Sequence, residues 1–299
     1  MTEAKGLDAE ELMEEELENE FDIGLNPTGD DGSSFRTEND PASPYQRKNV
    51  TERKGVVDVR CSLVGVAHGL PHPDSDDFFA TLILLKFTFA SRKEGRRIKA
   101  AHISLQFAAM DQGGDDPEVA KIAPHGSFHL VRTTQQEDEK RSLGLNIGAP
   151  PLAGIQASAE LGWEKNVSRE TSDATKLVGS IDLVGRNYGA ADAASWSLME
   201  NGMTKAGVPA SMCTAILLKR RDEKPFRCAF KIKATVDFLS SVQKLFGSRP
   251  KDDPIWFNPA MEPTENLQKY DPDSLEAVNI EELASVAFPT ALDGAGEHV

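Results

Sequence analysis

Apolar and polar residues alternate along several stretches of this chain, and residues 226–238 show the alternation most clearly. The apolar positions are Phe226, Cys228, Phe230, Ile232, Ala234, Val236 and Phe238, and Arg227, Lys231, Lys233, Thr235 and Asp237 lie between them. Only a pleated strand places alternate side chains on opposite faces. The pattern therefore predicts a strand with one face in a core and the other in water.

Residues 78–89 form a second run that is apolar on both faces. One face carries Phe79, Thr81, Ile83, Leu85, Phe87 and Phe89, and the other carries Phe78, Leu82 and Leu84. Strands with this pattern are typical of sheets that are covered on both sides. We therefore expect this strand to be central in its sheet.

Shorter alternating runs predict the remaining strands. They lie at residues 57–63, 103–109, 128–132, 141–147, 155–164, 175–184, 194–199 and 212–219, separated by clusters of Gly, Pro, Asn and Asp. About ten short strands with turn signals between them are typical of an all-β, antiparallel β-sandwich. We assign the sandwich to residues 55–249 and expect one short helix after its last strand, at residues 239–246.

The two ends of the chain differ from this body. Residues 1–40 hold 14 acidic and 2 basic residues, so most of the net charge of −15 belongs to this end. High charge and low hydrophobicity predict a disordered acidic arm over residues 1–54. Residues 250–299 are rich in Pro and acids but keep apolar residues such as Trp256, Leu275 and Ile280. That pattern predicts an extended strap that covers a sheet edge and then frays.

One segment of the arm has the spacing of a partner-binding helix. Met13, Leu17 and Phe21 recur every four residues and would line one face of a helix that docks into a groove on a protein partner. The plainer interpretation is a solvated acidic tail. Because an acidic arm repels nucleic acid, we expect no nucleic-acid partner.

The sequence favours an intracellular protein. The first residues are acidic and do not resemble a secretory signal, and no apolar run is long enough for a transmembrane helix. Cys61, Cys213 and Cys228 are too few and too scattered for a disulfide framework. We therefore expect reduced thiols and a cytoplasmic location, with the nucleus as the alternative.

Three stretches carry a resemblance to known proteins. They are residues 176–186 (KLVGSIDLVGR), 214–220 (TAILLKR) and 252–259 (DDPIWFNP). In these stretches the chain resembles a group of uncharacterised β-rich proteins of filamentous fungi, over roughly residues 55–289. No activity is assigned to that group, so the resemblance implies domain limits and a eukaryotic intracellular setting but no catalytic residues.

The sequence offers few candidates for catalytic or metal-binding residues. His68 and His72 lie near three Asp residues in a Pro-rich loop, where a polar hairpin loop is favoured over a metal site. His102 shares a strand face with Ser104 and Gln106; it would act as an acid or base if that face lined a pocket, and is otherwise a polar surface residue. The common nucleophile, phosphate, dinucleotide and metal motifs are absent. We therefore assign no catalytic residue, metal or cofactor and do not expect an enzyme.

The segment around residues 142–185 allows two interpretations. Alternate residues on one face are apolar: Leu143, Leu145 and Ile147, then Ile155, Ala157, Ala159, Leu161 and Trp163. A hairpin that inserts into a membrane needs this pattern, because one face meets lipid and the other meets water. The interior of a sandwich needs the same pattern, and this second interpretation is favoured.

The absence of catalytic motifs and the two polar tails favour a non-enzymatic binding or adaptor protein on a β-sandwich scaffold. A membrane-active, pore-forming-like β-hairpin protein is the first alternative. An enzyme with a pocket inside the sandwich is the second.

Overall fold

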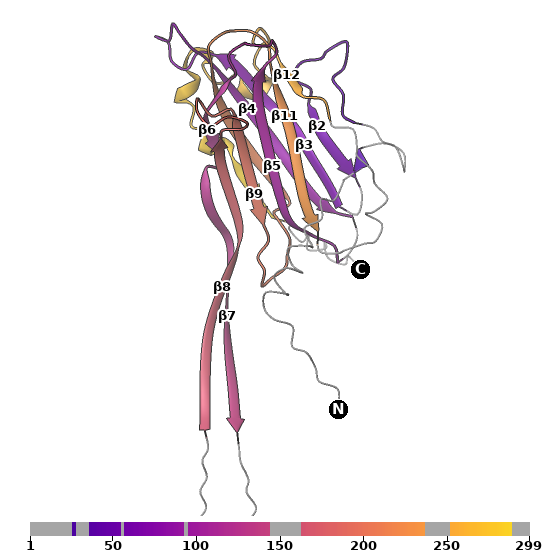
Figure 1. The fold of residues 1–299 in the computed structure, drawn as a ribbon, viewed down its shortest axis with the longest axis vertical. Coiled ribbons are helices and arrows are strands. Elements are labelled where there is room, and N and C mark those ends of the chain that lie inside the picture. Colours follow the sequence, from indigo (N-terminus) through magenta and orange to yellow (C-terminus); the bar gives the residue numbers. More distant parts are fainter. Residues whose placement is uncertain are drawn as a thin grey trace, which may run out of the picture.

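The chain folds into two antiparallel β-sheets that pack face to face (Figure 1). The computed structural model describes residues 26–27, 36–54, 57–92, 95–143, 163–236 and 252–288. The prediction of an all-β, antiparallel sandwich is confirmed. Within the described ranges, no helix has the length and apolar character needed to cross a membrane.

The first sheet has the strand order β1-β2-β3-β4-β10-β13, and β6 also pairs with β10. Its strands are β1 (Asn26–Pro27), β2 (Asn49–Lys54), β3 (Val57–Gly69), β4 (Phe79–Ser91), β6 (Glu118–Ala123), β10 (Ser211–Arg220) and β13 (Ser285–Ala287). Both edges of β4 are paired, along β3 on one side and β10 on the other. The strand predicted to be central therefore is central.

The second sheet has the strand order β12-β11-β5-β9-β8-β7. Its strands are β5 (Ile98–Ala109), β7 (Gly126–Leu143), β8 (Trp163–Asp182), β9 (Ala193–Met199), β11 (Phe226–Val236) and β12 (Ile255–Phe257). β7 joins two stretches that the sequence predicts as separate strands, and β8 extends far beyond the predicted one. The polar and charged residues 133–140, between the two predicted strands, do not interrupt the ladder, because pairing uses backbone groups.

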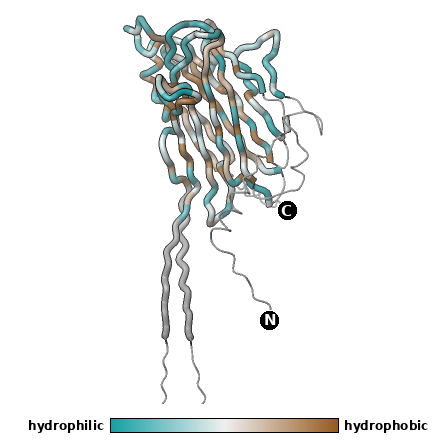
Figure 2. The backbone as a smooth tube through the Cα atoms, in the orientation of Figure 1, coloured by the Kyte–Doolittle hydropathy of each residue, from teal (hydrophilic) through white to brown (hydrophobic). Residues whose placement is uncertain are grey.

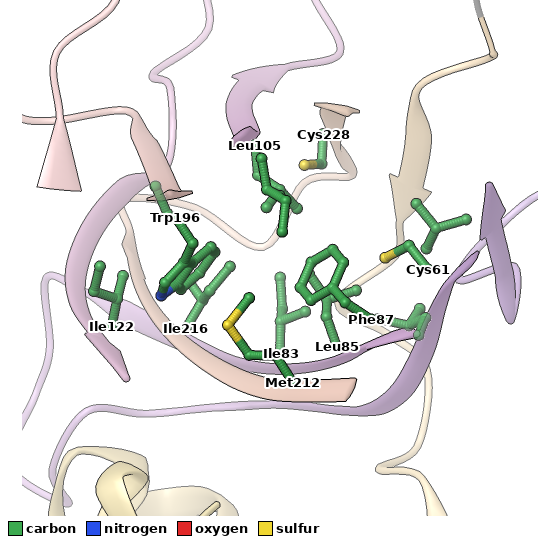
Figure 3. Packing of buried hydrophobic residues seen from close by; sticks show 14 of the residues in the cluster. Cys61, Ile83, Leu85, Phe87, Leu105, Ile122, Trp196, Met212, Ile216 and Cys228 are labelled. Carbon is green, nitrogen blue, oxygen red and sulfur yellow. The ribbon is translucent and has the colours of Figure 1, made fainter. Parts of the chain in front are cut away.

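Inward-facing residues of both sheets form one continuous core. Ile83, Leu85, Phe87, Met212 and Ile216 of the first sheet face Leu105, Trp196 and Cys228 of the second (Figure 3). The Phe87 and Phe230 rings stack across the interface with centroids 6.3 Å apart. Figure 2 shows the same division along the chain, with apolar positions in the strands and hydrophilic residues in the loops at the end opposite the hairpin. Burial of these two faces holds the sheets together.

The outer face of the first sheet is covered by the C-terminal segment. This strap, residues 252–288, contributes β12, β13 and the 3-10 helices η2 (Glu265–Leu267), η3 (Pro272–Ala277) and η4 (Ile280–Leu283). Leu267, Leu275 and Ile280 are buried against Leu82 and Leu217 in a second apolar cluster. The strap therefore covers the apolar residues on the outer face of β4.

The ordered body begins before the predicted boundary at residue 55. Asn49–Lys54, assigned to the acidic arm, forms β2 and pairs with β3. Arg47 donates to the carbonyl oxygens of Asp253 and Pro254 at 2.6 and 3.1 Å, and Arg53 pairs with Asp252 at 2.6 Å. These charged side chains suggest a solvated tail in the sequence, whereas here they attach the N-terminal segment to the strap. The helix predicted at residues 239–246 lies outside the described residues.

The turn that carries the chain from β6 in the first sheet to β7 in the second lies against the core. The carbonyl oxygen of Pro124 accepts a hydrogen bond of 2.9 Å from the indole Nε1 of Trp196, which is fully buried. A Cβ atom on Gly179 of β8 would lie 2.1 Å from the same carbonyl oxygen. Position 179 therefore has no room for a side chain, and the start of β7 is fixed against the sandwich.

We expect Trp196→Phe to lower the free energy of unfolding by about 1–3 kcal/mol, since the buried carbonyl of Pro124 loses its donor. Urea denaturation measures the change. The matched control is Trp256→Phe, because the Trp256 side chain is only half-buried. An effect at position 196 no larger than that at position 256 would contradict the assigned role.

Candidate functional site

The β7–β8 hairpin extends beyond the sandwich. β8 pairs with β9 only from Lys176 to Asp182, whereas it pairs with β7 from Gly179 out to Trp163. The outer part of both strands therefore leaves the sandwich and runs away from it as a two-stranded stalk (Figure 1). The 13 residues from Trp163 to Thr175 span roughly 40 Å, at about 3.4 Å per residue.

The stalk sequence is polar on both faces. Residues 132–142 and 164–173 together contain 11 charged residues among 21, and Val167 is the one large apolar residue in them. A strand that packs on a core shows apolar residues at every second position. The stalk sequence is therefore suited to water on both faces.

The sequence changes sharply at the far end of the stalk. From Leu143 to Trp163 a run of 21 residues contains a single charge, Glu160. The backbones of Leu143 and Trp163 pair with each other at the end of the hairpin farthest from the sandwich (Figure 1). Residues 144–162 lie outside the described residues. The favoured interpretation of this segment as sandwich interior is therefore wrong for Leu143 and Trp163.

Asp173 holds β8 where it leaves the sandwich. Its carboxylate accepts hydrogen bonds from the backbone amides of Ala174 at 2.7 Å and Gly202 at 2.6 Å. The amide of Asn201 donates to its backbone carbonyl at 3.2 Å. The hydrogen bond from Ala174, followed by that from Gly202, lowers the pKa of the Asp173 carboxyl below its usual 3.8. The charged form of Asp173 thus connects the root of the stalk to the β9–β10 loop.

His102 lies on the open outer face of the second sheet. Its side chain is exposed, and its Nδ1 is 2.9 Å from the hydroxyl of Ser197 on β9. The neighbouring Ile103 points inward and is fully buried in the core. His102 therefore does not line an interior pocket of the kind that the enzyme alternative requires.

His68, in contrast, is buried at the end of β3. Its Nδ1 is 2.9 Å from the hydroxyl of Thr81, and its Nε2 is 2.8 Å from the side-chain amide of Gln46. Arg220, which is also buried, donates to the same Thr81 hydroxyl at 2.9 Å. Burial, followed by the positive charge of Arg220, lowers the pKa of His68 to about 3. The imidazole is thus a neutral member of a buried polar network.

The loop that contains His72 does not bring the predicted metal ligands together with His68. His72 is exposed, whereas both ring nitrogens of His68 are occupied by protein partners. Across the described ranges, no group of three or more His, Cys, Asp or Glu residues is placed to hold a metal ion.

The residues at the root of the stalk differ from the binding residues that the sequence predicts. Met13, Leu17 and Phe21, the proposed partner-binding residues, lie outside the described residues, so the adaptor role stays a prediction. Asp173 and Gly179, at the root of the stalk, are not among the candidate residues expected from the sequence. An isolated Gly within an alternating strand is a general signal of close backbone approach, and Gly179 carries that signal.

Comparisons with known proteins add little. No family model and no curated protein matches the chain. Among solved structures, the Clostridium perfringens NetB toxin in its membrane-inserted form is 10% identical with a TM-score of 0.27, covering 60% of this chain and 78% of that one. Clostridium perfringens delta-toxin is 10% identical with a TM-score of 0.25, covering 69% and 90%. Similarity this low assigns neither a fold nor an activity to the chain.

We expect the free energy of unfolding to fall on acidification, through His68. The unfolded chain binds a proton on this residue below its usual pKa of 6.5, whereas the folded chain stays neutral down to about pH 3. Stability from this residue is therefore lost as the pH falls from 6.5 towards 3, by about 1.4 kcal/mol per pH unit. Urea titrations between pH 6.5 and 4 should show a shallower pH dependence for His68→Gln than for wild type or for exposed His102→Gln. Equal slopes would count against this role.

We expect Asp173→Ala to speed hydrogen exchange at the Gly202 amide, because its acceptor is removed. In the wild type the same protection should be present above the usual carboxyl pKa and should decrease as the pH falls through the lowered pKa of Asp173. Exchange measured by NMR tests both effects. Asp182→Ala serves as the control, since Asp182 accepts from Ser180 and Ser195 instead. Unchanged Gly202 exchange in Asp173→Ala would refute the contact.

Proposed function

We propose that this protein acts on lipid bilayers by inserting the tip of the β7–β8 hairpin. The observation that carries the proposal is the polar stalk, which ends at Leu143 and Trp163 roughly 40 Å from the sandwich, where the sequence becomes apolar. A folded protein rarely presents contiguous apolar sequence at its periphery unless that sequence meets a partner or a membrane. A projecting two-stranded hairpin has the backbone geometry that a bilayer accepts once its edges are paired.

The tip sequence fits a lipid environment better than a protein groove. Its limbs, Leu143–Ala149 and Leu152–Trp163, hold 7 and 12 residues on either side of Pro150–Pro151. Strands that cross bilayers need about 9–11 residues and alternate apolar with small or polar side chains. The second limb is long enough to cross a bilayer, whereas the first reaches only part of the way. Trp163 stands at the boundary between charged stalk and apolar tip, where membrane strands commonly carry aromatic residues.

The same geometry implies that several copies act together. Beyond the Lys176–Met199 pair, the stalk strands pair with no other strand in the described part of the chain than each other. Unpaired backbone groups are tolerated in water, but each costs several kcal/mol in hydrocarbon. An inserted tip therefore needs neighbouring hairpins on both sides. In a closed ring of copies, the backbone groups on both edges of every hairpin are hydrogen-bonded.

A matched pair of substitutions tests the insertion. Leu145 and Asn146 are adjacent and lie on opposite faces of the predicted strand. Leu145→Arg places a charge on the lipid face at a cost of about 2–4 kcal/mol, whereas a charge on the water face costs little. We expect Leu145→Arg to abolish dye release from vesicles and Asn146→Arg to retain most of it.

The assay uses the full chain and vesicles of neutral and anionic composition, between pH 4 and 7.5. Circular dichroism of each variant in solution checks that the sandwich is intact. Absence of dye release by the wild type under every condition would overturn the proposal, and so would equal loss of release in both variants.

A further inference from the structure

The outer faces of the two sheets differ in what covers them. The first sheet lies beneath η2, η3 and η4 of the strap. No described segment covers the second sheet in the same way, and alternate residues on its outer face are exposed or half-buried. These outer residues include Lys231 and Lys233 on β11, His102 on β5, Ser197 on β9, and Lys176 and Val178 on β8.

This open face is basic. Arg227, Lys231 and Lys233 follow one another on the outer side of β11, and Lys176 lies across the sheet on β8; all four side chains are exposed. None of the four forms an ion pair with any described residue. The acid on the same face, Asp182, accepts hydrogen bonds from Ser180 and Ser195 at its far end. The charge of Lys176 also acts on Asp173, where it contributes to the lowered pKa of that carboxyl. The basic face, defined by Arg227, Lys231, Lys233 and Lys176, therefore carries net positive charge, which is concentrated on β11.

The chain also contains a segment of opposite charge. Residues 1–25 contain 10 acidic residues and one lysine. Asn26 and Pro27 follow this segment and pair with Lys54 and Arg53 of β2, and Arg53 forms an ion pair with Asp252 at 2.6 Å. Asp252 and Asp253 precede β12, the edge strand of the second sheet. The arm is thus attached beside the sheet whose outer face is basic.

We propose that the acidic arm, residues 1–25, docks on the basic face of the second sheet of its own chain. Crossing from β12 to β8 requires roughly 20 Å at about 4.8 Å per strand, which 25 residues span several times over. Tethering gives the arm an effective concentration on the order of millimolar, so weak pairwise attractions suffice. The docked arm excludes other polyanions, including anionic lipid, from this face.

Charge-specific crosslinking of the full chain tests the docking. A carbodiimide joins an ammonium group directly to a carboxylate that it contacts, and mass spectrometry then identifies the joined peptides. Lys86, exposed on the outer face of the first sheet, provides an internal comparison. A mixture of 14N- and 15N-labelled protein separates crosslinks within a chain from those between chains.

We expect crosslinks within one chain from residues 1–25 to Lys231, Lys233 and Lys176, several-fold more abundant than those to Lys86. They should weaken strongly between 20 mM and 1 M salt, since the screening length falls from more than 10 Å to about 3 Å. Lys231→Gln with Lys233→Gln should lower arm crosslinks to Lys176, whereas Lys86→Gln should not. Crosslinks spread evenly over both sheets, or found only between differently labelled chains, would overturn the proposal.

Discussion

Every part of this structure depends on the burial of two apolar sheet faces against each other. Residues from β3, β4 and β10 meet residues from β5, β9 and β11, and Trp196 lies fully buried among them. A sheet with one apolar face gains stability only by removing that face from water, and a second sheet supplies the complementary surface. The strap, the N-terminal segment and the hairpin are all held by elements that this core has already fixed.

The core also determines where the hairpin begins. The buried indole of Trp196 holds the carbonyl oxygen of Pro124, and that carbonyl occupies the space where Gly179 lacks a side chain. β7 and β8 thus start from a fixed position, and Asp173 secures β8 again at the edge of the sandwich. Beyond that point only backbone pairing continues, which allows a charged sequence to extend the two strands into water.

Charged residues have two separate roles in this chain. Arg47, Arg53 and Asp252 are half-buried. Their hydrogen bonds and ion pair attach the N-terminal segment to the strap at specific positions. Arg227, Lys231 and Lys233 are exposed and act, in the proposed docking, through their summed field. The division follows from solvent access, because a buried ion requires a specific partner whereas an exposed row of like charges attracts any polyanion.

The sequence by itself determined the fold class and the inward faces of the main strands. Alternation in residues 226–236 and the doubly apolar run of β4 have one structural solution, since side chains on a strand point to opposite sides. Sequence alone could not place β2, assign the strap to the outer face of the first sheet, or separate sandwich interior from projecting tip at Leu143 and Trp163. Those outcomes depend on contacts between residues far apart in the chain. Periodicity records which side of a strand is apolar but not what that side meets, so only the tertiary structure decided them.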